Sequence, residues 1–210
     1  MSALFPIFMK LGGRPCLVVG AGTVGEPKIA SLLDADATVK VVAPEATEQV
    51  KSWARESRIH WEQRAFEASD IERCFLVVTA TNSIEVNETV YREAQARGVL
   101  CNAVDDPDRC DFYYPAIVRR GPLQIAVSTA GYSPALAQRL RRELEDQFGP
   151  EYSGWVEQLG QERTRLRDDR TISAEDCRER LHVQASASAY QEFIADRHLT
   201  PRLKDAQNGG

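Results

Sequence analysis

Apolar and polar residues alternate in blocks over the first half of the chain. Four short runs are almost continuously apolar and rich in β-branched side chains: residues 16–20, 38–44, 74–81 and 99–104. Such runs are typical of strands in a parallel sheet whose two faces are both covered. Segments of helical period lie between them, one of which can begin at Asn82 or Ser83 and end at Gly98. The alternation predicts a doubly wound α/β domain with right-handed crossovers.

The pattern changes near residue 113. Residues 115–129 predict two strands around the turn Arg120-Gly121-Pro122, with no helix between them. A helix then begins after the N-cap Ser133 and ends before Gly149, and its apolar residues recur every four positions: Leu136, Leu140, Leu144 and Phe148. Residues 151–210 are charge-rich and mostly helical, and we expect the last ten to be frayed.

This second part of the chain is poorly suited to fold alone. A single strand pair and a few amphipathic helices bury little apolar surface. They predict a surface that a second copy of the chain completes, and we therefore expect a homodimer. The alternative is that these segments fold back onto their own chain.

Composition places the chain among ordinary soluble globular proteins. Of its 210 residues 43% are apolar and 27% charged, and the formal net charge is −5. This balance gives no reason to expect a nucleic-acid partner, because such partners favour a basic face. No apolar run approaches the roughly 20 residues needed to span a bilayer, and the N-terminus makes a poor signal peptide. The five scattered cysteines never form CxxC, which favours reduced structural thiols. We expect a cytoplasmic protein without a membrane partner.

A glycine-rich turn follows the first apolar run. Gly20, Gly22 and Gly25 form a GxGxxG motif directly after a predicted strand and at the start of a predicted helix. Gly20 would permit the tight turn, Gly22 would let the backbone approach a pyrophosphate, and Gly25 would let the helix pack closely on the strand. The phosphates would lie on free N–H groups at the helix N-terminus. An ordinary glycine turn is the alternative, but the β-turn-α context favours dinucleotide binding.

The prediction of NAD rather than NADP rests on this loop. The acidic residue that normally holds the adenine ribose is replaced by Val42-Ala43-Pro44. Glu45 comes one position late and can equally be a first-turn helix residue, and no arginine there indicates a 2′-phosphate. We expect NAD to be held by residues of the loop and of the neighbouring strand ends: Gly20, Gly22, Thr23, Val24, Gly25, Ala43, Pro44, Thr79, Ala80 and Thr81. The last three could instead only cap the following helix.

An aspartate-rich stretch, from Asp105 to Asp111, follows the fourth apolar run. Its order fits no calcium loop of the EF-hand type, and Cys110 alone is no zinc site, so we expect no metal site. Asp106-Pro107-Asp108 is typical of a turn. Asp105 differs because it directly follows a buried strand, where the ligand crevice of such a fold opens. We expect its carboxylate to be partly desolvated and able to accept a proton near neutral pH, with a purely local turn role as the alternative.

Three stretches together resemble the precorrin-2 dehydrogenase domain of siroheme synthases. They are LFPIFMKLGGRPCLVVGAGTVGEPKIASLL, FLVVTATNSIEVN and CNAVDDPDRCDFYYPAIVRRGPLQIAVSTAGYSPALAQRLRRELE, and the likeness runs from about residue 4 to 150 in matching order and spacing. The resemblance implies an enzyme that uses NAD to oxidise precorrin-2 to sirohydrochlorin. In some members the same site also inserts ferrous iron to give siroheme.

The resemblance also implies an organisation and a fold class. The fold is α/β, with a Rossmann-type parallel sheet followed by a dimerisation segment and a C-terminal helical domain. We expect the NAD-binding Rossmann domain over residues 1–112, the dimerisation region over 113–150 and the helical domain over 151–210. The expected partners are the tetrapyrrole substrate, a second copy of the chain and Fe²⁺ where the chelatase step exists.

Specific residues are implied as well. The resemblance carries the family's key aspartate onto Asp105, which could take the proton that must leave when a hydride is removed from the macrocycle. A substrate with many carboxylates needs a basic rim, for which Arg119, Arg120 and Arg139 are candidates, although each could be only a solvated charge. Ser128, which we group with them, matches a serine that some relatives phosphorylate; its alternative role is strand-end hydrogen bonding.

The glycine loop departs from the family pattern, which resembles GGGxVAxRK. Pro27 stands in place of the arginine, so that Lys28 is the nearest basic group. Because the chain stops at residue 210, we expect it to act after a separate methyltransferase. Two other hypotheses stay open: a chelatase whose NAD site is vestigial, and an NAD-sensing regulatory module.

Overall fold

The computed structural model describes residues 4–196. The last part of the predicted helical domain, with the ten residues expected to be frayed, lies outside the described residues. The chain divides into two compact units, Met1–Tyr114 and Pro115–Gly210. Within residues 4–196, no helix combines the length and the apolar character that a membrane crossing requires.

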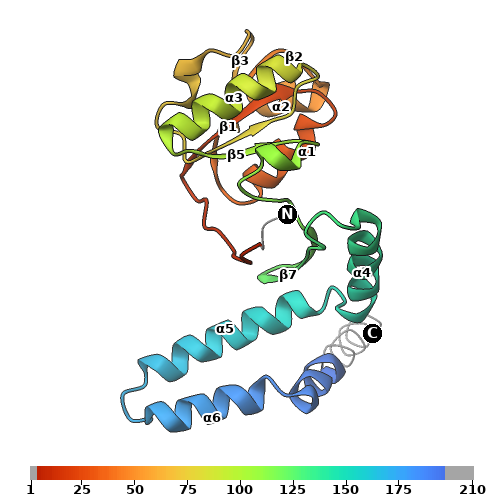
Figure 1. The fold of residues 1–210 in the computed structure, drawn as a ribbon. Coiled ribbons are helices and arrows are strands. Elements are labelled where there is room, and N and C mark those ends of the chain that lie inside the picture. Colours follow the sequence, from red (N-terminus) through yellow and green to blue (C-terminus); the bar gives the residue numbers. More distant parts are fainter. Residues whose placement is uncertain (1–3, 197–210) are drawn as a thin grey trace, which may run out of the picture. The chain divides into compact units, whose positions relative to one another are not determined.

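The first unit is built on a five-stranded parallel sheet (Figure 1). Its strand order is β3-β2-β1-β4-β5, and every pair is parallel. The strands are β1 (Pro15–Ala21), β2 (Thr38–Ala46), β3 (His60–Glu62), β4 (Leu76–Thr79) and β5 (Leu100–Ala103). The helices are α1 (Gly25–Leu33), α2 (Glu48–Arg55) and α3 (Ile84–Arg97), with short 3-10 turns η1 (Ala68–Ile71) and η2 (Pro107–Arg109). The predicted α/β fold with four parallel strands is confirmed, and β3 is an additional edge strand.

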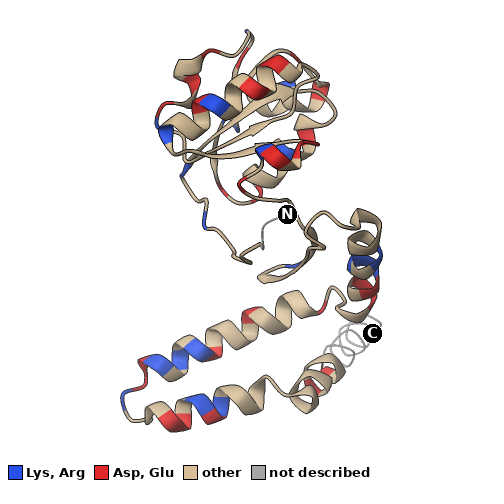
Figure 2. Cartoon of the chain, in the orientation of Figure 1, with Lys and Arg blue, Asp and Glu red and all other residues tan. Residues whose placement is uncertain are grey.

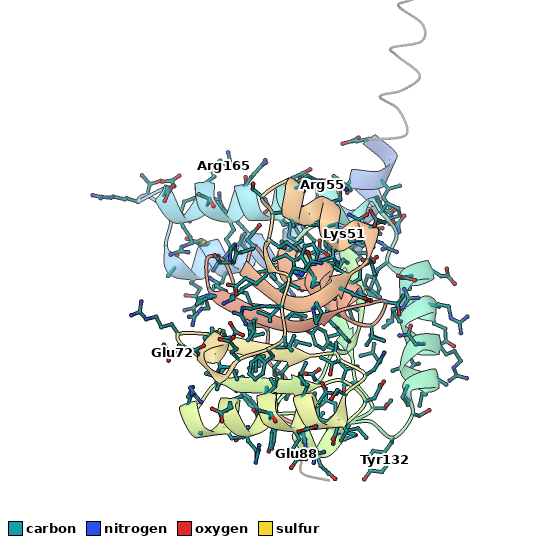
Figure 3. The ribbon with its side chains drawn as sticks, turned by 90° about the horizontal axis from the view of Figure 1, so that it is seen from above. Lys51, Arg55, Glu72, Glu88, Tyr132 and Arg165 are labelled. Carbon is teal, nitrogen blue, oxygen red and sulfur yellow. The ribbon has the colours of Figure 1, made fainter. Side chains whose placement is uncertain are left out.

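Both faces of this sheet are covered by helices. Alternate residues of β1 point to opposite faces, so that Cys16 and Val18 join a buried cluster with α1 and α2, whereas Leu17 and Val19 join a second cluster with α3. Figure 3 shows the sheet between α2 and α3. This double coverage explains why the strands are apolar along their whole length instead of alternating with polar residues.

The helix ends follow the local sequence signals. Ser83 caps α3, because its hydroxyl accepts a hydrogen bond from the N–H of Val86 at 3.3 Å. Gly98 ends the same helix with a positive φ of 65°, a conformation that glycine adopts without strain. The prediction of a helix between these two signals is confirmed.

The second unit begins with a β-hairpin followed by helices. β6 (Ala116–Arg120) and β7 (Leu123–Val127) pair antiparallel, as predicted. The helices are α4 (Pro134–Gln147), α5 (Tyr152–Asp168) and α6 (Ala174–Gln184), and residues 187–196 are also helical. Ser133 caps α4 through the N–H of Leu136 at 3.2 Å, as predicted. Charged residues gather at the ends of α5 and α6 that flank their connecting loop (Figure 2).

An aromatic cluster joins the helices of the second unit. The ring of Tyr152 lies 5.1 Å from that of Phe148 and 4.5 Å from that of Tyr190, and Trp155 lies 4.8 Å from Tyr190 between ring centroids. The hydroxyl of Tyr190 donates to the carboxylate of Glu151 at 2.6 Å. These contacts connect the end of α4, the start of α5 and the helix over 187–196.

Candidate functional site

Two glycines of the β1–α1 turn are required by the backbone geometry. Gly20 has a φ of +97°, and a Cβ built there would lie 2.5 Å from the carbonyl oxygen of Ala80. A Cβ at Gly25 would lie 2.3 Å from the carbonyl oxygen of Gly20. Both distances are too short for any other residue. The turn and close-packing roles predicted for Gly20 and Gly25 are therefore seen in the structure.

Gly22 lies at the open side of the same loop. A Cβ at this position would meet no atom within 4 Å, so space remains in front of the backbone. The following helix, α1, has no side-chain cap at its N-terminus, so its first N–H groups have no side-chain acceptor. Uncapped N–H groups and the helix dipole together favour a bound anion. The loop thus has the geometry of a phosphate site.

A pocket of about 480 Å³ opens in front of this loop. It is lined by four segments at the carboxyl ends of the strands: the end of β1 with the glycine loop, the end of β2, the loop after β3, and the segment from the end of β4 into α3. Of the predicted cofactor-binding residues, the pocket is lined by Gly20, Gly22, Thr23, Val24, Ala43, Pro44, Ala80 and Thr81. Gly25 and Thr79 do not line it: both are buried behind it. The lining also includes residues that the sequence did not indicate, namely Ala65, Phe66 and Val86.

The segment after β4 is held by the side chain of Asn87 on α3. The hydroxyls of Thr79 and Thr81 both donate to its amide oxygen, at 2.6 and 2.7 Å. Its amide nitrogen donates to the carbonyl of Thr81 at 3.0 Å. Thr81 therefore lines the pocket and is also hydrogen-bonded to α3. A role in the nucleotide pocket and a role at the start of the following helix are thus compatible for this residue. Asn87 was missed as a site residue, although it ends the NSIEVN stretch of the resemblance.

Asp105 lies directly after β5, at the same edge of the sheet. Its backbone has a positive φ of 64°, which aspartate tolerates better than most residues. Its side chain is exposed in this chain, so the expected partial desolvation is not observed. The reason is that Val104 and Asp105 form a turn between β5 and η2. Its carboxylate forms no hydrogen bond or ion pair with the other residues that the structure describes.

The remaining aspartates of this stretch have structural partners. Asp106 forms an ion pair with Arg109 across η2. Asp111 accepts hydrogen bonds from the N–H of Cys101 at 2.8 Å and from Gln95 at 2.9 Å. The thiol of Cys110 contacts the carbonyls of Ala103 and Asp106 at 3.1 and 3.2 Å. The turn interpretation of Asp106–Asp111 and the structural role of Cys110 are confirmed. Residues 4–196 contain no group of three His, Cys, Asp or Glu side chains that could hold a metal ion.

One lysine lies close to Asp105. The ammonium of Lys28, in α1, stands 4.0 Å from the centre of the Tyr114 ring. Burial lowers the pKa of Lys28, and the negative charge of Asp105 partly offsets this effect. Burial also raises the pKa of the Tyr114 hydroxyl to about 12. Lys28 therefore supplies a half-buried positive charge at the edge where Asp105 lies.

The predicted substrate-binding residues all belong to the second unit. The guanidinium of Arg120 donates to the carbonyls of Phe148 at 2.7 Å and Glu145 at 3.1 Å, where it caps the end of α4. Arg139 lies 3.4 Å from Glu143 on α4. The hydroxyl of Ser128 accepts from the N–H of Ala130 at 3.1 Å, which is the strand-end hydrogen bond considered above. Arg119 lies on β6.

The parallel sheet, the glycine turn and the pocket at the strand ends together define a dinucleotide-binding Rossmann unit. Residues 7–116, just over half of the chain, match the family model described as "Putative NAD(P)-binding". The chain belongs to this NAD(P)-binding family. Residues 120–147 match a second model, "Sirohaem biosynthesis protein central".

Individual relatives agree with these models. The chain is 45% identical over 162 residues to the siroheme synthase of Nitrosococcus oceani, which covers 77% of this chain and 34% of the relative. It is 35% identical to a siroheme synthase of Neisseria meningitidis over an alignment that covers 98% of this chain and 44% of the relative. The chain thus spans about a third of the length of the first relative and less than half of the second. Among solved structures, "SirC, precorrin-2 dehydrogenase" matches with a TM-score of 0.75 and 26% identity, covering 92% of this chain and 98% of that one. These matches confirm the resemblance and the fold class inferred from the sequence.

Proposed function

We propose that this protein oxidises precorrin-2 to sirohydrochlorin with NAD as the acceptor. The observation that carries this proposal is that a dinucleotide pocket and an exposed, unpaired carboxylate, Asp105, lie at the same edge of one parallel sheet. Ligands of open α/β sheets bind at this edge. The names of the relatives, siroheme synthase and precorrin-2 dehydrogenase, support the choice of substrate.

The pocket residues fit a nicotinamide dinucleotide. The open backbone at Gly22 and the uncapped start of α1 suit its pyrophosphate. Ala43 and Pro44 would hold the adenosine half, and Ala80 and Thr81 the nicotinamide half. When bound, NAD accepts the hydride that leaves the macrocycle.

In this proposal Asp105 is the base. Loss of a hydride from one carbon must be accompanied by loss of a proton, so a carboxylate within reach of the macrocycle completes the balance. The Asp105 carboxylate can accept this proton because no described residue occupies its oxygens. Lys28 would contribute positive charge toward the carboxylates of the substrate. For Arg119 and Arg139, which belong to the second unit, a role in substrate binding stays a prediction. Arg120 contributes less directly, because its donors bind the end of α4.

Substitution of Asp105 tests the proposal. Supplied with precorrin-2 and NAD, the wild-type chain should produce sirohydrochlorin, followed by its absorbance. Asp105→Asn should lower kcat by about 10²–10⁴-fold, the range for loss of a general base, and leave NAD affinity unchanged. Asp108→Asn is the matched control, since this exposed aspartate lies three residues away in η2. Equal activity in Asp105→Asn and wild type would remove Asp105 from the mechanism, and absence of NAD-dependent oxidation would refute the dehydrogenase.

We also propose that Asp105 serves iron insertion. Chelation of Fe²⁺, here a substrate, requires two pyrrole N–H protons to leave. The exposed Asp105 carboxylate can accept them one at a time and pass each to water before it takes the next. Addition of Fe²⁺ to sirohydrochlorin should then give siroheme faster with the protein than without it, and Asp105→Asn should abolish the difference. Metal insertion without NAD-dependent oxidation would instead favour a chelatase with a vestigial NAD site. Tight NAD binding with neither reaction would favour an NAD-sensing module.

The proposed working form is a cytoplasmic homodimer with three parts: residues 1–112, 113–150 and 151–210. Two features of the second unit support the dimer. The β6–β7 hairpin is a sheet of only two strands, and Leu136 on α4 is 38% exposed although it begins the apolar stripe. Two-stranded sheets need further packing to be stable.

The free cysteines suit the reducing compartment that a cytoplasmic protein occupies. The dimer can be tested by the mass of the protein in solution. Analytical ultracentrifugation should give twice the 23.4 kDa chain mass.

A further inference from the structure

Strand β2 carries extra residues at the rim of the dinucleotide pocket. Val42 pairs with Val19, and Ala46 pairs with Ala21, so β2 advances by four residues while β1 advances by two. The N–H of Thr47 then donates to the carbonyl of Ala21 at 3.0 Å. This hydrogen bond ties the end of β2 to the glycine loop. The residues between the two pairs therefore form a bulge that is fixed at both ends.

The bulge determines where Glu45 lies. Counted along a regular strand, Glu45 comes one position too late for the ribose-binding acid, and it could belong to the next helix. In the structure it belongs to β2, and α2 begins only at Glu48, after the cap Thr47. Pro44 and Glu45 are exposed, and both line the pocket. A carboxylate thus stands at the carboxyl end of the second strand, where Rossmann folds hold the adenine ribose.

Glu45 is the one charged side chain in the lining of this pocket among the described residues. A 2′-phosphate would bring about two negative charges beside a carboxylate, with no lysine or arginine in the lining to neutralise them. A 2′-hydroxyl would instead donate a charge-assisted hydrogen bond to it. Phe66, from the loop after β3, adds an aromatic ring to the same pocket, which suits a purine.

We infer that Glu45 binds the 2′-hydroxyl of the adenine ribose and makes the site selective for NAD over NADP. This inference rests on the proposed function, because it assigns a role within its cofactor site. The bulge compensates for the acid missing after Val42: two extra residues bring a later carboxylate to the rim.

Titration of the full chain with dinucleotides tests the assignment. The ligands are NAD, NADP and 2′-deoxy-NAD (lacking the adenosine 2′-hydroxyl), and binding is followed by calorimetry. Wild type should bind NAD about tenfold or more tightly than 2′-deoxy-NAD, as expected for one charge-assisted hydrogen bond. Glu45→Gln should lose most of this difference and narrow the preference for NAD over NADP. Glu48→Gln is the matched control, because Glu48 is exposed, pairs with Lys51 at 2.7 Å and does not line the pocket.

The outcomes separate this inference from the function on which it rests. If wild type binds NAD but Glu45→Gln keeps the same discrimination against 2′-deoxy-NAD and NADP, the role of Glu45 is wrong and the function stands. If wild type binds neither NAD nor NADP, both are overturned. An unchanged melting temperature for Glu45→Gln would show that any loss of affinity is local to the site.

Discussion

The two units of this protein bury their apolar residues to very different extents. In the first unit, five parallel strands are covered on both faces, and fully buried residues such as Leu17, Val18 and Val77 fill two clusters. In the described part of the second unit, the buried hydrophobic residues are only Ala116, Val118, Ala137 and Leu166. A complete core fixes the strand ends on which a site can be built, whereas an incomplete one leaves apolar surface available for assembly. The packing of the first unit thus suits the proposed chemistry, and that of the second suits the proposed association.

The dinucleotide site depends on close packing between the glycine loop and α1, and Gly25→Val should disrupt this packing. A Cβ at Gly25 would lie 2.3 Å from the carbonyl oxygen of Gly20, so the phosphate loop and α1 would have to separate. We expect a loss of about 2–3 kcal/mol in the free energy of unfolding, as for overpacked cores, and an NAD affinity reduced at least a hundredfold.

Gly22→Ala is the matched control for this substitution, because its added methyl group meets no protein atom within 4 Å. It should leave the melting temperature unchanged and weaken NAD binding alone. Calorimetric unfolding and NAD titration measure the two effects separately. If Gly25→Val were as stable as wild type, the close packing described here would be wrong.

A charge on the exposed side of α4 should weaken the proposed dimer. Leu136→Glu places a carboxylate at a residue that is 38% exposed in the single chain, so the fold of the chain should be little affected. If a second copy covers this residue, burial of the charge should weaken the dimer by about 2 kcal/mol or roughly thirtyfold. Gln138→Glu adds the same charge at an exposed position of the same helix, and should leave the dimer intact. Sedimentation at decreasing concentration measures both, and equal dissociation of the two variants would argue against an interface at Leu136.

A smaller effect is expected at Asp70, which anchors the loop that carries Phe66. Its carboxylate is 2% exposed and accepts hydrogen bonds from Arg64 at 2.8 Å, Lys40 at 2.9 Å and the N–H of Glu67 at 2.9 Å. Burial alone would raise the pKa of Asp70, but these donors outweigh it and hold the pKa far below its usual range. Asp70→Asn should therefore cost about 1–3 kcal/mol at pH 7.

The stabilisation by Asp70 should depend on pH. Because the pKa of Asp70 is lower in the folded state, its stabilisation is present above the unfolded pKa of about 4 and is lost as the pH falls below that value. Wild type should lose stability in acid, and its advantage over Asp70→Asn should shrink there. Glu72→Gln, at an exposed carboxylate two residues away, should follow wild type at every pH. Urea unfolding of wild type and the two variants at pH 7 and pH 3 checks these expectations. If the free energies of unfolding of wild type and Asp70→Asn differed by the same amount at both pH values, the ion-pair account would be contradicted.

The elements whose signals are local were predictable from the sequence. Strand β1 and helix α3 are specified by apolar runs and by the cap Ser83, and the GxGxxG turn requires glycine for reasons that hold in any β-turn-α unit. Strand β3 escaped prediction because three residues, His60–Glu62, are too few to show a period. The exposure of Asp105 also escaped, because it depends on how the chain turns after the strand and not on the strand itself.

The sequence by itself determined the parallel α/β fold, the phosphate loop and the family resemblance, because each is encoded in short-range pattern and spacing. Only the tertiary structure decided which side chains meet. Strand pairing across residues distant in the sequence created the bulge that brings Glu45 to the pocket. Packing of α3 on β4 brought Asn87 to Thr79 and Thr81. The physical reason is that such contacts depend on register between strands and on side-chain geometry, to which a one-dimensional pattern is insensitive.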